Sequence, residues 1–248
     1  MQRKNYRDVR AARGPLTIEV EVPGPGYRHL VTADDLRRFI ALIPGWAEVS
    51  VGLHAIVLAG GDPCIDGRYE DGVIELHAWR DPPATSVGAR HFAEHRAVYE
   101  RLGVRWRASP RFIAAVPVKG TSVEDMRAVV ELIRDELEDD ELILAAAEDG
   151  EVDAWVAIDR KLRHVGPVCC DVTRIGAELH VYERCHALAF DRRTAAAYQL
   201  LHVFLHELGH HIDACAPLRR GWRGEEYAEG WALRCADRIW AAYVTEFG

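Results

Sequence analysis

The residues with the clearest chemical potential form the string HELGH, positions 206–210, inside the apolar stretch AAAYQLLHVFLHELGHHIDA. His206 and His210 are four residues apart, so on a helix both imidazoles project from one face, about one turn apart. Two imidazoles so placed can bind one zinc ion, and Glu207 lies beside them without having to ligate it. The spacing therefore predicts a metal site that activates water, with Glu207 as the general base.

The residues around this string follow a helical pattern. Apolar side chains recur at intervals of three and four and form one buried stripe: Leu201, Phe204, Leu205, Leu208 and Ile212. A loop with the sequence GWRG, residues 221–224, follows downstream. A second helix is expected to begin near Glu225, in the segment EEYAEGWALRCADRIW. Two helices are therefore available to build the site.

Zinc held by two histidines needs a third protein ligand, which leaves one coordination position open for water. Glu225 and Glu229 lie one turn apart on one face of the second helix, and either could reach the ion. Glu229 is the favoured ligand because it lies a full turn into the helix, with Glu225 as the alternative ligand or as its helper.

The HELGH string, then eighteen residues, then Glu229-Gly230-Trp231-Ala232, resembles the gluzincin metallopeptidases. Those proteins carry HExxH on one helix and a metal-binding Glu on the next. The gap and the E-G-aromatic-A string are similar to the aminopeptidase-N-like branch, although its Gly-x-Met-Glu-Asn loop is absent here. The resemblance implies one Zn²⁺ on His206, His210 and Glu229. It also implies a zincin-like α+β fold with a mixed sheet, and peptide or protein substrates.

A second register of the same helix resembles a different branch. The residues from Glu225 to Glu229 are similar to the E-x-x-[AS]-[DN] pattern of thermolysin-like and small regulatory gluzincins. In that register Glu225 binds the metal and Glu229 hydrogen-bonds a ligand histidine. Glu229 in place of Asp or Asn departs from the pattern, and both registers stay open at this point.

The reaction expected of such a site is hydrolysis. Glu207 would accept a proton from water and pass it to the leaving nitrogen. The oxyanion needs a further donor, for which the candidates are Tyr227, His211, Tyr182 and His180. The strand expected at residues 177–184 lies just upstream, and we expect it to be an edge strand to which an extended peptide could pair.

The remaining pattern predicts a single α+β domain over residues 1–248, with a soft division into an accessory part, 1–140, and a metal-binding part, 141–248. Alternating or apolar runs predict strands at 16–22, 48–59, 72–80, 112–118, 154–158 and 177–184. Helices are expected at 32–43, at 89–102 and after Ser122. Residues 60–72 are rich in turn formers and predict a loop.

Composition excludes several classes of protein. The chain has 248 residues, 49% of them hydrophobic and 28% charged, with a net charge of −8. The chain has no basic patch with interleaved aromatics, so the sequence does not predict nucleic-acid binding. No apolar run approaches the ~18 residues that cross a bilayer, and the N-terminus lacks the apolar core of a secretory signal. Six cysteines without a CxxC pair indicate reduced thiols, hence a cytoplasmic protein.

Two alternatives to a soluble zinc peptidase remain. A zincin-like binding or regulatory module would hold zinc with little or no proteolysis. A carboxylate-bridged di-iron protein would use Glu207-x-x-His210 and Glu183-x-x-His186 as two ExxH elements. The second alternative requires four helices that present their ligands inward.

Overall fold

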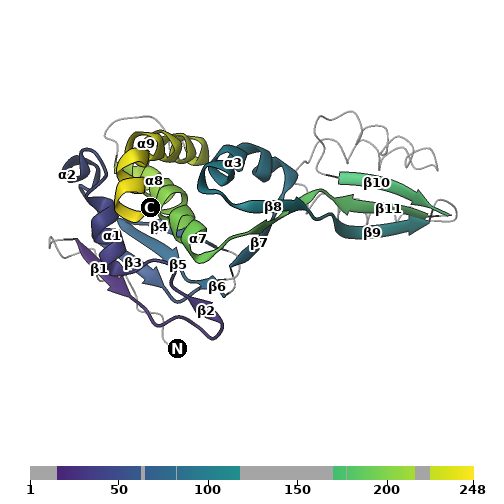
Figure 1. Cartoon of the computed structure of the whole chain (residues 1–248), viewed down its shortest axis with the longest axis horizontal. Coiled ribbons are helices and arrows are strands. Elements are labelled where there is room, and N and C mark those ends of the chain that lie inside the picture. Colours follow the sequence, from purple (N-terminus) through teal and green to yellow (C-terminus); the bar gives the residue numbers. More distant parts are fainter. Residues whose placement is uncertain (1–15, 63–64, 82, 118–169, 177, 216–223) are drawn as a thin grey trace. The chain divides into compact units, whose positions relative to one another are not determined.

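The computed structural model describes residues 16–62, 65–81, 83–117, 170–176, 178–215 and 224–248. It has a mixed α/β architecture, with helices and mixed sheets (Figure 1). The chain divides into two compact units: residues 1–84 together with 190–248, and residues 85–189. The first unit therefore combines both ends of the sequence, whereas the expected division separated residues 1–140 from 141–248. The strands before residue 84 are in the same unit as the HELGH helix.

A four-stranded mixed sheet forms the base of the first unit, in the order β1 (Thr17–Val20), β3 (Ala55–Ala59), β5 (Val73–His77), β4 (Gly67–Glu70). The first three strands are parallel, and β4 runs antiparallel to β5 at the edge. All five residues of β3 are buried, which explains why this strand is apolar throughout instead of alternating. A separate antiparallel pair joins β2 (Tyr27–Arg28) to β6 (Trp79–Arg80).

Helix α1 (Ala33–Ile40) confirms the helix expected after Thr32. The Thr32 hydroxyl accepts from the backbone N–H of Asp35, and the Asp35 carboxylate accepts from that of Thr32. This capping box satisfies two donors that the first turn would otherwise leave unpaired. Leu36 and Phe39 are fully buried, and the Phe39 ring packs edge-on against Phe204, 5.9 Å between centroids.

The HELGH string lies in a longer helical rod. Helix α7 (Arg192–Tyr198) leads into the π-helical turn η2 (Gln199–Phe204) and then α8 (Leu205–Cys215). Helix α9 (Gly224–Phe247) packs against α8. In η2, Gln199 is buried and its amide donates to the backbone oxygen of His77 at 2.7 Å. This bond ties the rod to the end of β5.

The expected boundaries changed at two places in this unit. The strand expected at 48–59 begins only at Ala55, because residues 46–49 form the short helix α2 (Trp46–Val49). The loop expected at 60–72 contains β4. Among the described residues, none of the helices combines the length and apolar character that crossing a membrane requires. The expected elements at 122–137 and 154–158 lie outside the described residues.

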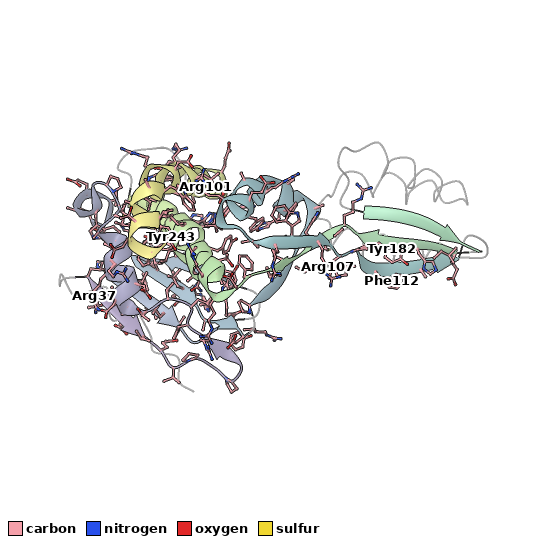
Figure 2. The ribbon with its side chains drawn as sticks, in the orientation of Figure 1. Arg37, Arg101, Arg107, Phe112, Tyr182 and Tyr243 are labelled. Carbon is pink, nitrogen blue, oxygen red and sulfur yellow. The ribbon has the colours of Figure 1, made fainter. Side chains whose placement is uncertain are left out.

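The second unit contains two three-stranded sheets. One has the order β7 (Ala84–Gly88), β12 (Cys185–Ala189), β8 (Arg105–Ala108), and α3 (Ala89–Leu102) packs on it through Phe92, which stacks on His186. The other has the order β10 (Cys170–Ile175), β11 (Glu178–Glu183), β9 (Arg111–Pro117). Figure 2 shows Tyr182 and Phe112 on this second sheet. Their ring centroids lie 5.6 Å apart.

Strand β11 confirms the strand expected at 177–184 but not its expected place at a sheet edge. It pairs with β10 on one side and β9 on the other, so both of its backbone edges are already hydrogen-bonded. A central strand has no free edge for an added peptide strand. The expectation that residues 177–184 form an edge strand for peptide pairing is therefore wrong.

Candidate metal centre

His206 and His210 project from one face of α8, as their spacing predicts. Their Nε2 atoms lie 3.0 Å apart, and the two rings meet edge-on with centroids 4.7 Å apart. His210 is buried and His206 is half-buried. The two imidazoles therefore point their outer nitrogens at one place.

Glu225, in the first turn of α9, reaches the same place. Its carboxylate oxygens lie 3.0 Å from Nε2 of His206 and 3.4 Å from Nε2 of His210. One ligand atom from each of these three residues lies within 4.8 Å of the others. Two imidazole nitrogens and one carboxylate oxygen are a donor set that catalytic zinc takes. The residues therefore fit a zinc ion.

Glu229 contacts His206 from the other side of the ring. Its Oε2 lies 3.1 Å from Nδ1 of His206, and its side chain is 24% exposed against 82% for Glu225. A histidine that binds metal through Nε2 commonly donates its Nδ1–H to a carboxylate that fixes the ring. For a metal held by these residues, the geometry suits Glu225 as the ligand and Glu229 as the residue that orients His206, which favours the second register over the one preferred from the sequence.

The pKa of His206 reflects these neighbours. Burial lowers it, but the hydrogen bond to Glu229 and the charges of Glu207, Glu229 and Glu225 raise it, and the net result lies above the usual value. For His210 the balance is reversed. Burial and the charge of His206 bring its pKa below the usual value, although Glu225 acts against them.

The position of Glu225 depends on a close approach of α8 and α9 at Gly209. A Cβ atom added at Gly209 would lie 2.7 Å from Cα and 2.9 Å from the carbonyl oxygen of Ala228. The two backbones can therefore meet only because residue 209 has no side chain. The buried Asp213 adds a second tie, since its Oδ2 accepts from the backbone N–H of Gly224 at 3.3 Å. Together they fix where the first turn of α9 lies.

Gly209→Ala is expected to lower the free energy of unfolding by about 1–3 kcal/mol, because the added methyl overpacks a backbone contact. Gly230→Ala is the matched control. At Gly230 a Cβ would meet only the flexible end of Arg234, at 3.1 Å, so alanine should stabilise the helix by roughly 0.5–1 kcal/mol. Urea unfolding of both variants measures the difference. Equal stabilities would contradict a backbone contact at Gly209.

Glu207 is a residue of α8, and its side chain lies against the edge strand β4. Its side chain is buried, and a Cβ at Gly67 would lie 3.2 Å from its Cγ. Burial raises the pKa of Glu207 to about 7, even though His206 acts to lower it. A carboxyl group that titrates near neutral pH is suited to accept and return a proton.

The structure separates the four residues considered as oxyanion donors. His211 is fully buried, with Nδ1 3.3 Å from the Tyr69 hydroxyl and Nε2 3.2 Å from the carbonyl oxygen of Val51. Its pKa is lowered, mainly by burial. Because both of its ring nitrogens face protein partners, it cannot serve a substrate, which corrects the role expected for it. Tyr227 is half-buried on α9, in the same turn as Glu225. Tyr182 and His180 belong to the second unit.

The second ExxH element of the di-iron alternative is not helical. Glu183 lies on strand β11 and His186 on strand β12, where the His186 ring stacks on Phe92 with centroids 3.8 Å apart. A di-iron site needs these ligands on inward-facing helices. In the described part of the chain, the elements around Glu183 and His186 do not provide them.

Sequence reasoning missed His202 and β4. His202 is buried, and its Nε2 lies 3.8 Å from Oε2 of Glu229. Its spacing of four from His206 repeats the spacing of the motif and could have identified it. Strand β4 reads GRYE and lies in a segment rich in Gly, Asp and Pro. Such a short polar strand carries no alternating apolar signal.

Comparison of the chain with protein-family models, with curated proteins and with solved structures found no match. The resemblance to gluzincins therefore rests on residues 206–232 alone. The functional inference depends on the geometry of the side chains described above.

Proposed function

We propose that this protein is a zinc-dependent hydrolase of the gluzincin type that cleaves peptide bonds. The observation that supports this most strongly is the convergence of His206, His210 and Glu225 beside the buried carboxyl of Glu207. A zincin-like arrangement is part of the proposal, with a mixed sheet, an HExxH helix and a following helix that brings the third ligand.

In the proposed reaction one zinc ion would act as a Lewis acid and would lower the pKa of water toward ~7. Glu207 takes a proton from the attacking water at its carboxylate and returns it to the leaving nitrogen. Glu229 holds the ring of His206 through Nδ1, which keeps Nε2 directed at the site.

We propose that the substrate pairs with the outer edge of β4, which we call the substrate ledge. This strand pairs with β5 on one side and is the last strand of its sheet, and it lies against α8 close to Glu207. An extended peptide could pair with the outer edge of β4 and so bring a carbonyl group next to the site. This geometry favours peptide substrates over small molecules.

The test is metal analysis combined with hydrolysis of a peptide library. We expect about one zinc ion per chain. A chelator should remove both the zinc and the activity, and added zinc should restore them. Protein without zinc would contradict the metal site. Zinc without cleavage of any peptide would contradict the enzyme and leave the binding or regulatory module.

A further inference from the structure

His211 connects α8 to strand β4 on the side of the helix away from the metal ligands. Its imidazole is wholly buried. Nε2 lies 3.2 Å from the carbonyl oxygen of Val51, and Nδ1 lies 3.3 Å from the hydroxyl of Tyr69. The His211 and Tyr69 rings also meet edge-on, with centroids 5.4 Å apart. A buried polar ring with both nitrogens engaged is a fixed structural link.

Only one assignment of donors and acceptors fits the hydrogen bonds of His211. A carbonyl oxygen can only accept, so Nε2–H of His211 donates to Val51 and Nδ1 is left as an acceptor. The Tyr69 hydroxyl then donates to Nδ1, and its oxygen accepts from the backbone N–H of Gly72 at 3.2 Å. The phenol of Tyr69 is therefore held at once by α8 and by the turn that follows β4.

The proposed general base lies against the same strand. A Cβ atom added at Gly67, two residues before Tyr69 on β4, would lie 3.2 Å from Cγ and 3.3 Å from Oε1 of Glu207. The strand that His211 holds through Tyr69 is therefore also the strand that faces Glu207. In the described sheet, β4 is an edge strand whose only strand partner is β5. Its contacts with α8 therefore help to fix its position.

We propose that Tyr69 and His211 form a positioning pair, which holds β4 against α8 and thereby orients Glu207 and the substrate ledge. The hydrogen bonds that define the pair join the two side chains to each other, to Val51 and to Gly72. The effect on catalysis rests on the proposed function, but the effect on β4 does not. A misplacement of about 1 Å in a catalytic group can cost roughly 10²-fold in rate, so a small shift of β4 is enough to matter.

The test compares Tyr69→Phe with Tyr243→Phe by hydrogen exchange of the β4 amides in the full chain. Both tyrosines are at least half-buried, but the Tyr243 ring packs against Phe39 of α1 and Phe247 of α9. Loss of the Tyr69 hydroxyl should speed exchange at the Tyr69 amide by roughly tenfold. Tyr243→Phe should leave that amide unchanged. Equal exchange in the two variants would overturn the pair.

Substitutions at His211 test whether the two residues act as one unit. His211→Asn keeps an acceptor near the position of Nδ1, whereas His211→Leu removes it. We expect Asn to preserve protection of the Tyr69 amide better than Leu. In the Tyr69→Phe background the two should be alike, because the partner is gone. Additive effects would contradict the pair, and Tyr69→Phe alone decides the matter if the His211 variants do not fold.

Zinc content and kinetics separate this proposal from the proposed function. Tyr69→Phe should keep its zinc and lose kcat by roughly tenfold or more. If the wild type cleaves nothing but β4 exchange responds as stated, the proposed function fails and the pair stands. If the wild type cleaves peptides and Tyr69→Phe matches it in both rate and exchange, the pair fails and the function stands.

Discussion

Glu207→Gln is expected to lower hydrolysis by roughly 10²–10⁴-fold while the protein keeps its zinc. The amide has nearly the shape of the carboxyl group, but it cannot take a proton from water. Because Glu207 is not among the three converging ligands, the metal should stay bound. Parallel measurement of kcat/KM and of zinc per chain gives the result.

Glu226→Gln is the matched control, since Glu226 is exposed on α9 next to Glu225. It removes a carboxylate beside Glu225 without touching the Glu207 carboxyl. We expect activity within about twofold of the wild type, as for most surface changes. Full activity in Glu207→Gln would rule out the general base, and a large loss in Glu226→Gln would point to charge alone.

Glu225→Gln and Glu229→Gln are expected to differ sharply in zinc affinity. In the proposed site Glu225 is one of three protein ligands, so its loss should leave zinc held by two histidines and abolish measurable hydrolysis. Glu229 orients His206 through Nδ1, and loss of such a partner typically weakens metal binding by roughly 10–100-fold. Competition against a coloured zinc chelator measures both affinities.

The order of the two effects decides the register of α9. A larger loss of affinity in Glu225→Gln supports Glu225 as the ligand. The reverse order would return Glu229 to the metal, as the spacing from HELGH first indicated, and would require α9 to rotate.

The local parts of the site could be predicted from the sequence. The helical stripe around HELGH and the four-residue spacing place His206 and His210 on one face, and the structure agrees. The capping box at Thr32 and Asp35 was also readable, because both partners lie within one turn. In these cases the interacting groups are close in the chain, so the pattern contains the answer.

The choice between Glu225 and Glu229 could not be made in the same way. Both lie on one face of α9, and which of them meets Nε2 depends on how α9 is rotated against α8. The contact of Gly209 with Ala228 and the bond from Gly224 to Asp213 set that rotation. Both are tertiary contacts. The same limit explains β4, whose place is set by pairing with β5 and not by its own composition.

The unit that carries the site is interrupted in the chain by residues 85–189. Its sheet is synthesised early, while Glu225 and the rest of α9 follow more than a hundred residues later. On the ribosome, the apolar surface of strands such as β3 therefore stays uncovered until the last helices emerge. Closing such a long loop is slow compared with local contacts. Uptake of zinc would then mark the end of folding, and a chain that stalls within the second unit should expose its sheet to chaperones.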